Sequence, residues 1–159
     1  MIKLGEQAPE FKLKGYFNGK FKEYALKDYR NKWLVIFFYP LDFTFVCPTE
    51  IKQFSQEYPK FKKLNAEVVG VSVDSEHSHK AWVEGPLGKI NFALLSDFHK
   101  RMAEDYEVLL EDEGIALRGT FIIDPYSKLL IQSRTGHRNL RQNLKLRRSN
   151  TDICKTSRG

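Results

Sequence analysis

The uninterrupted apolar run at residues 33–38, WLVIFF, constrains the fold of this 159-residue chain more than any other feature. It is rich in β-branched and aromatic residues, which favour strands. No polar residue alternates with the apolar ones, so the run predicts a strand that is buried on both faces of a sheet. A similar segment, AEVVGVSVD at residues 66–74, predicts a second buried strand.

A helical pattern lies between these two segments. Apolar side chains recur there at spacings of three and four residues, which predicts a helix that begins near Cys47. The residues that carry this pattern are Ile51, Phe54, Tyr58 and Phe61. A further helix is expected at 75–84, carrying Trp82.

Other segments predict more strands and one more helix. Alternating segments at 9–17 and 20–26 flank Asn18-Gly19, a strong signal for a β-hairpin. Residues 91–97 predict a short strand, and residues 97–109 a helix capped by Asp97. Strands are then expected at 119–124 and 128–133, joined by a turn that starts at Asp124-Pro125.

Buried strands that alternate with helices indicate an α/β domain, and the closing pair of strands makes its central sheet mixed. The length fits one domain, which we place at residues 1–133, followed by a divergent basic tail at 134–159. Residues 1–131 carry 18 Lys and Arg against 19 Asp and Glu, whereas residues 132–159 carry eight basic residues and only one acidic residue. The excess positive charge therefore belongs to the tail.

Composition argues against several classes of protein. The body of the chain has no basic face of the kind that binds nucleic acid. No apolar run is long enough to span a bilayer, and no secretory signal is visible, so we expect a cytoplasmic protein. Two cysteines 107 positions apart are not a disulfide scaffold, and they predict reduced thiols.

Cys47 occupies an unusual position, in the loop between the strand at 33–38 and the helix that follows. Pro48 and Glu50 both suit a first helical turn. A thiol at a helix start meets unpaired N–H groups and the positive end of the helix dipole, which favour the thiolate. Thr44 lies three residues earlier, and Pro40 ends the strand where it could shield a pocket from water. The residues alone leave two interpretations open: a reactive nucleophile, or a small buried apolar side chain.

The stretch FYPLDFTFVCPTE, with Pro40, Thr44 and Cys47 in the pattern P-x-x-x-T-x-x-C, resembles the peroxidatic motif of the peroxiredoxins. It is close to the typical 2-Cys branch, which includes thioredoxin peroxidases and the peroxidase component of alkyl hydroperoxide reductase. LGEQAPEFKLKG, VVGVSVDSEHSHKAW and DEGIALRGTFIIDP resemble segments of the same family in the same order. The resemblance covers about residues 3–133.

This resemblance implies a thioredoxin-like fold and a thiol-dependent peroxidase that uses no metal and no cofactor. Cys47 would attack a hydroperoxide and become a sulfenic acid. Arg118 matches the active-site arginine of the family, and its guanidinium fork would hold the thiolate and polarise the peroxide. Thr44 would hydrogen-bond the reacting oxygens, and Glu50 would orient Arg118. The implied partners are thioredoxin or a flavoprotein disulfide reductase as electron donor, and further copies of the chain in a homodimer or a ring of dimers.

The tail departs from the family pattern after DPYSKLLIQS. Cys154 is the one candidate for a resolving cysteine, and its neighbours do not match the family. The abrupt change in charge prompts the hypothesis that the tail is read in a shifted frame, which the encoding nucleotide sequence tests. Without a working Cys154 the protein would depend on an external thiol.

Other interpretations of the sequence are weaker. The spacing of His77 and His79 suits neither one helix face nor a common metal site, so we expect both in a solvent-exposed turn. A holdase-like or signalling role fits the family, but no residue points to it. The basic tail suits electrostatic attachment to nucleic acid or anionic lipid, yet it has no aromatic residue for stacking on bases.

Overall fold

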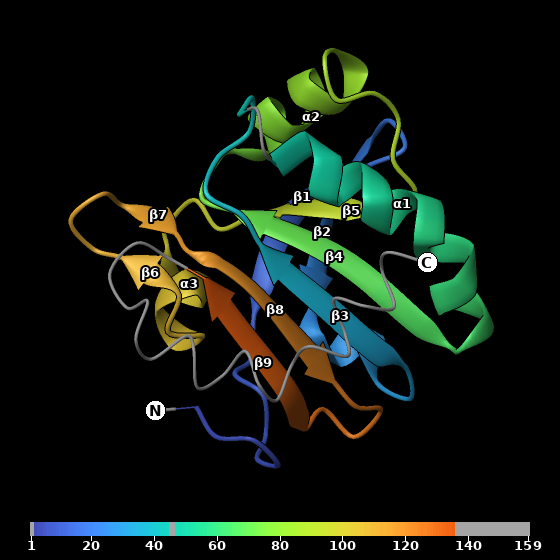
Figure 1. Ribbon diagram of the computed structural model, residues 1–159, viewed down its shortest axis with the longest axis vertical. Helices are drawn as coiled ribbons and strands as arrows, with labels where there is room; N and C mark the ends of the chain where they lie inside the picture. Colours follow the sequence, from blue (N-terminus) through green and yellow to red (C-terminus); the bar gives the residue numbers. More distant parts are fainter. Residues whose placement is uncertain (1, 45–46, 136–159) are drawn as a thin grey trace.

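A seven-stranded mixed sheet forms the centre of the computed structural model, which describes residues 2–44 and 47–135 (Figure 1). Its strand order is β2-β1-β5-β4-β3-β8-β9. β3 and β4 run parallel, as do β4 and β5, and the other neighbours are antiparallel. The strands are β1 (Lys12–Phe17), β2 (Lys20–Ala25), β3 (Trp33–Phe38), β4 (Ala66–Ser72), β5 (Ala93–Ser96), β8 (Arg118–Ile123) and β9 (Leu129–Thr135).

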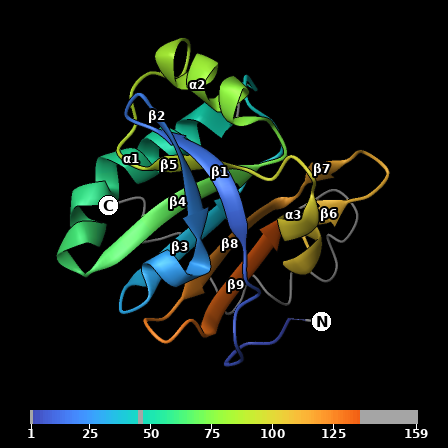
Figure 2. The ribbon, with the colours of Figure 1, turned by 180° about the vertical axis from the view of Figure 1, so that it is seen from behind.

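The helices are α1 (Cys47–Lys63), α2 (Glu76–Glu84) and the short α3 (Arg101–Asp105), with a 3-10 turn at Leu26–Tyr29. A small separate hairpin joins β6 (Leu109–Leu110) and β7 (Ile115–Ala116). α1 lies in front of the sheet alongside β4 in Figure 1, and the reverse view in Figure 2 brings β1, β2 and α3 to the front. In the part of the chain that the structure describes, no helix is long and apolar enough to cross a membrane.

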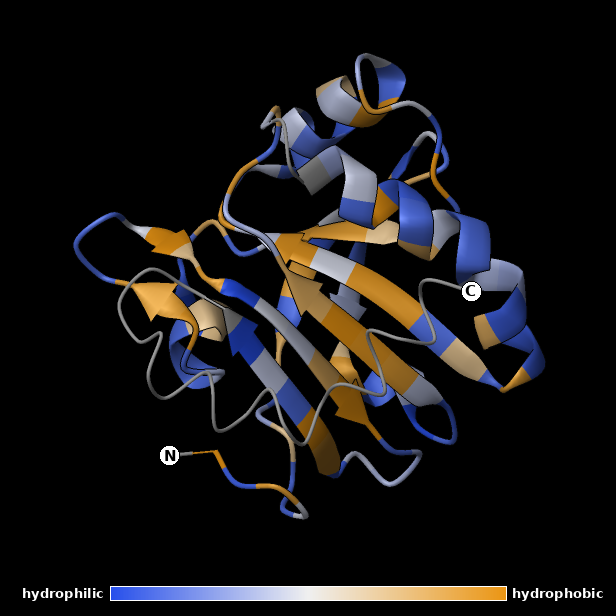
Figure 3. Ribbon diagram, viewed as in Figure 1, coloured by the Kyte–Doolittle hydropathy of each residue, from blue (hydrophilic) through white to orange (hydrophobic). Residues whose placement is uncertain are grey.

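The β3 strand divides the hydrophobic core into two layers. Leu34, Ile36 and Phe38 point into one cluster, and the intervening Val35 and Phe37 point into the other. α1 and α2 cover the second cluster, to which they contribute Ile51 and Trp82 among others. Figure 3 shows β3 and β4 hydrophobic over most of their length. The prediction of a strand buried on both faces is thus confirmed.

The predicted β1–β2 hairpin is confirmed, and its register pairs Phe17 with Lys20 across Asn18 and Gly19. Both turn residues have positive φ, 50° and 82°, as a two-residue hairpin of this kind requires. The predicted turn after β8 is also confirmed. There the Asp124 carboxylate accepts N–H bonds from Tyr126 and Lys128 at 2.9 and 2.8 Å.

A helix is present within the predicted range 97–109, but the predicted bounds are wrong, because α3 spans only Arg101–Asp105. Lys100 has a left-handed conformation with φ 63°, so the chain turns before the helix begins. Asp97 still caps the helix from a distance: its two carboxylate oxygens accept the N–H groups of Met102 and Ala103 at 3.0 and 2.7 Å. The β6–β7 hairpin takes up the residues that follow, and the sequence patterns did not predict it.

A proline in the middle of α1 creates a contact with a distant loop. Pro59 has no N–H, so the carbonyl of Ser55 loses its usual partner in the helix. The side-chain amide of Asn91 donates to that carbonyl at 2.9 Å, and the backbone N–H of Asn91 donates to the Ser55 hydroxyl at 3.0 Å. The helix is thereby fixed to the segment that leads into β5.

Candidate active site

The loop after β3 is the centre of the candidate site. Tyr39 extends the strand by one residue, since its N–H donates to the carbonyl of Val71 at 3.0 Å. α1 then begins at Cys47, as the sequence predicts, and Pro48 and Glu50 fall in its first turn. The placement of the Cys47 side chain lies outside what the structure describes. Thr44 is half-buried, and its hydroxyl donates to the carbonyl of Leu41 at 3.2 Å.

Arg118 reaches the same place from a strand much further along the chain. The β3–β8 register pairs Phe38 with Gly119, so Arg118 stands one step beyond the end of β3. Its Nη1 donates to the Oε2 of Glu50 at 2.9 Å. The structure thus brings Glu50 and Arg118 into contact, which joins β8 to the helical turn that begins with Cys47, while the orienting role of Glu50 stays a prediction. The catalytic roles of Arg118, Thr44 and Pro40 stay predictions.

On the other side of the loop lies a buried polar cluster that the sequence analysis missed. The carboxylate of Asp42 accepts bonds from the Tyr39 and Ser78 hydroxyls at 2.7 and 2.8 Å, and it lies 2.7 Å from the Nδ1 of His79. The Nε2 of His79 faces the carbonyl of Leu95 at 2.9 Å. The prediction that His79 lies in an exposed turn is wrong, because its side chain is fully buried on α2. His77, by contrast, is exposed as predicted, although it lies on α2 and not in a turn.

A signal for this cluster was present in the sequence. His79 precedes Trp82 by three residues, which places both side chains on the same face of a helix. Trp82 is fully buried in the core, so a histidine on its face is buried as well. A buried histidine then requires a polar partner, and Asp42 is the one charged residue in the apolar loop PLDFTFV.

The pKa values of two ionisable neighbours of Asp42 are raised. Burial, reinforced by the nearby Asp42 carboxylate, raises the pKa of Tyr39 well above its ordinary value, so the phenol keeps its proton and donates. Asp74 accepts the backbone N–H of Asp42 at 2.6 Å. Desolvation raises the pKa of Asp74 above its ordinary 3.8, although that backbone bond opposes the shift.

Phe43 continues the contact between the loop and α2. Its φ of 61° is left-handed, an unfavourable conformation for a residue other than glycine. The ring centroid lies 6.0 Å from that of Trp82, which in turn lies 5.8 Å from Tyr39. α2 thus holds the loop through Trp82 as well as through Ser78 and His79.

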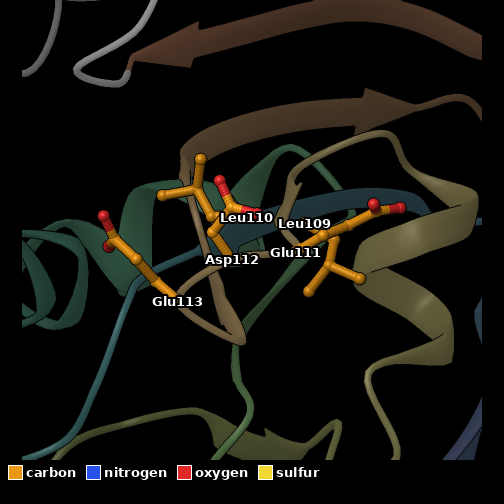
Figure 4. A pocket seen from close by; sticks show the side chains of 5 residues that line it. All are labelled: Leu109, Leu110, Glu111, Asp112 and Glu113. Atoms are coloured by element: carbon orange, nitrogen blue, oxygen red, sulfur yellow. The ribbon is translucent and has the colours of Figure 1, made fainter.

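A hollow on the β6–β7 hairpin is lined by none of the candidate site residues named above (Figure 4). It is lined by Leu109, Leu110, Glu111, Asp112 and Glu113. Three adjacent acidic side chains repel an anionic ligand, and no cationic group of the described residues lines the hollow with them. Within 2–44 and 47–135, no group of three or more His, Cys, Asp or Glu side chains could hold a metal ion.

Residues 4–130 match the model of the AhpC/TSA family. The chain belongs to this family. Peroxiredoxin-2 of Macaca fascicularis is 55% identical to it over 127 residues, which are 77% of this chain and 64% of that protein. The mitochondrial thioredoxin-dependent peroxide reductase of Rattus norvegicus is 57% identical over 125 residues, 76% of this chain and 49% of that protein. The chain therefore matches between about half and two thirds of the length of these relatives.

Solved structures of family members have the same fold. The reduced 2-Cys peroxiredoxin of Plasmodium vivax superposes with a TM-score of 0.81 at 34% identity, covering 96% of this chain and 98% of that one. AhpC of Enterococcus faecalis superposes with a TM-score of 0.83 at 32% identity, covering 99% and 96%. The predicted thioredoxin-like fold, with its mixed sheet flanked by helices, is confirmed.

Proposed function

We propose that this protein is an antioxidant thiol peroxidase, which reduces hydrogen peroxide and organic hydroperoxides through a sulfenic acid at Cys47. One observation carries the proposal: the motif cysteine is the first residue of α1, in the same helical turn as the Glu50–Arg118 ion pair. Family membership and more than 50% identity to peroxiredoxins support it.

The reaction is a displacement on oxygen. The Cys47 thiolate attacks the terminal oxygen of the hydroperoxide, so an S–O bond forms as the O–O bond breaks. Sulfur is oxidised by two electrons and the peroxide is reduced by two. The departing alkoxide or hydroxide takes up a proton and leaves as alcohol or water, while the sulfur becomes a sulfenic acid. Unpaired N–H groups at the start of α1 favour the thiolate that begins this step.

Arg118 and Thr44 would stabilise the charge that develops on oxygen. The guanidinium of Arg118 offers several donors in a fixed fork, of which Nη1 binds Glu50. The Thr44 hydroxyl donates a long hydrogen bond of 3.2 Å to the Leu41 carbonyl. Thr44 therefore accepts a hydrogen bond from a hydroperoxide as it stands, and it donates one only after it rotates away from Leu41.

Oxidation of the pre-reduced protein by one equivalent of hydrogen peroxide tests the proposal. We expect the wild type to consume the peroxide and to form a sulfenic acid that dimedone traps at residue 47. Cys47→Ser should do neither, whereas Cys154→Ser should still complete this single turnover. Peroxide consumption by Cys47→Ser at the wild-type rate would refute the proposal.

We further propose thioredoxin as the electron donor. The name of the rat relative describes that protein as thioredoxin-dependent, and the two chains share 57% identity over the matched residues. A flavoprotein disulfide reductase is the alternative donor. Steady-state NADPH oxidation with each reductant in turn separates the two, because only the true donor should sustain turnover beyond one equivalent of peroxide.

Cys154 is proposed to resolve the sulfenic acid of a second copy of the chain within a homodimer or a ring of dimers. It lies outside the described residues, so this proposal rests on the sequence and on related structures such as the Plasmodium vivax 2-Cys peroxiredoxin. A non-reducing gel after peroxide treatment should show a covalent dimer that Cys154→Ser loses. A dimer band that persists in that variant would remove Cys154 from the mechanism.

A further inference from the structure

A cluster of hydrogen-bonded side chains lies between the loop after β3 and α2. Asp42, Tyr39 and His79 are all buried, and Ser78 completes the cluster from α2. Three of the four contacts involve the Asp42 carboxylate, which is the centre of the arrangement. Tyr39 and Asp42 lie within the stretch that resembles the peroxidatic motif, but not at the positions of Pro40, Thr44 and Cys47 that define its pattern. None of the contacts described above joins the cluster to the Glu50–Arg118 pair.

The hydrogen-bond partners favour one arrangement of protons in the pair. The carbonyl of Leu95 can only accept, so the Nε2 of His79 carries a hydrogen. Asp42 already accepts from two hydroxyls, which is the pattern of an ionised carboxylate. The Nδ1 of His79, 2.7 Å away, therefore also carries a hydrogen and donates it. The result is a buried imidazolium–carboxylate pair that is neutral overall.

This pair holds the loop at its midpoint. Asp42 lies two residues before Thr44 and five before Cys47. Its backbone N–H is held by Asp74 and its side chain by α2, so both parts of the residue are immobilised. The next residue, Phe43, keeps a left-handed conformation that surrounding contacts must enforce. The direction in which the chain leaves Asp42 thus depends on the pair.

We propose that Asp42 and His79 are positioning residues for the peroxide reaction, which fix the path of the loop that carries Thr44 beside the start of α1 and Arg118. The proposal rests on the proposed function. It requires no contact between the pair and the substrate, because the effect passes through the backbone of the loop. Displacement of reacting groups by about 1 Å costs about a hundredfold in rate, so loss of the pair should slow peroxide reduction while the thiol itself stays reactive.

The test compares two reactions of one thiol. In a Cys154→Ser background, Cys47 is the only cysteine. Hydrogen peroxide needs the aligned site, whereas iodoacetamide needs only an accessible thiolate. His79→Phe should lower the rate constant with peroxide at least tenfold and change the rate of alkylation less than threefold. His77→Phe, a histidine substitution at an exposed position of the same helix, is the matched control and should change neither rate.

A second variant separates positioning from stability. Asp42→Leu combined with His79→Phe removes both charges together, which restores stability where a single change leaves a buried charge unpaired. We expect this double variant to unfold at a higher urea concentration than His79→Phe and yet to react slowly with peroxide. Recovery of the peroxide rate along with stability would overturn the positioning role.

A measurement on the unmodified protein keeps the proposal testable if the variants do not fold. Nitrogen-15 spectra of the histidine rings should show one histidine with both nitrogens protonated at neutral pH. A His79 ring whose Nδ1 is unprotonated and makes no hydrogen bond would overturn the pair. Failure of the proposed function is distinct, because the Cys154→Ser background would then react with peroxide no faster than free cysteine.

Discussion

Two ion pairs stand on opposite sides of the same loop, and they differ most in their exposure to water. The side chains of His79 and Asp42 are 0% and 1% exposed, whereas those of Arg118 and Glu50 are 27% and 48% exposed. A buried pair that loses one partner leaves a charge in the interior without water to solvate it. A half-exposed pair exchanges its partner for water at little cost.

The difference assigns separate tasks to the two pairs. Water competes with Glu50 for the partly exposed Arg118 guanidinium, so this pair can rearrange when a substrate binds. His79 has no such freedom, since both of its nitrogens face fixed acceptors. The loop therefore has a fixed side, toward α2, and a reactive side, toward β8.

Asp42→Ala should lower the free energy of unfolding by about 3–5 kcal/mol, because it leaves the His79 imidazolium buried and unpaired. Glu50→Ala is the control on the exposed side and should cost less than about 1 kcal/mol. Urea denaturation of both variants measures the comparison. Equal losses would mean that exposure does not distinguish the two pairs.

Arg118→Ala should slow peroxide reduction about 10²–10³-fold, the usual effect of removing one donor to a developing oxyanion. Its free energy of unfolding should change by less than about 1 kcal/mol, since the side chain is partly solvated. Arg118→Lys keeps the charge but not the fork, so recovery of part of the rate would separate the two contributions. An Arg118→Ala protein with the parent rate would place the chemistry elsewhere.

Asp97→Asn tests whether a buried carboxylate needs a cationic partner to contribute strongly to the stability of the fold. Asp97 is 1% exposed, and it caps α3 through one bond on each oxygen. An amide has a single acceptor oxygen, so one N–H of the helix would lose its partner, at a cost of about 1–3 kcal/mol. Thermal unfolding checks this value. A loss as large as that of Asp42→Ala would show that burial alone decides.

Asp74→Asn should have the smallest effect, and its sign depends on pH. The raised pKa of Asp74 means that the folded chain binds this proton more tightly than the unfolded chain. The contribution of Asp74 to stability is therefore complete below its ordinary pKa of 3.8, and it is lost as the pH rises through the raised value. Asparagine still accepts the Asp42 N–H but does not titrate. The variant should thus gain stability relative to the parent as the pH rises through this window, and parallel curves would contradict the assignment.

The central strands could be predicted from the sequence, because a strand buried on both faces is a continuous run of apolar residues. Alternate side chains of the run WLVIFF lie in the two hydrophobic clusters on either side of the sheet. The predicted helix bounds 97–109 are wrong for a local reason: Asp97 caps α3 across a left-handed Lys100 instead of from the position next to the helix. Periodicity does not report a conformation of that kind.

The candidate site divides in the same way. Arg118 and Glu50 could be paired from the sequence only through a family resemblance, since their 68-residue separation carries no local signal. The spacing between His77 and His79 carries no signal of burial, whereas the three-residue spacing between His79 and Trp82 does. The roles of Thr44, Pro40 and Arg118 need chemical tests, because positions alone do not measure reaction rates.

The proline in α1 bears on how this protein should be engineered. Helix propensity scales rank Pro59→Ala as an improvement of several kcal/mol. In this fold the N–H that alanine would introduce at position 59 would compete with Asn91 for the Ser55 carbonyl. The helix would become more regular and less firmly joined to the segment before β5. A substitution ranked by local propensity would thus weaken a contact between distant parts of the chain, in the helix whose first residue is Cys47.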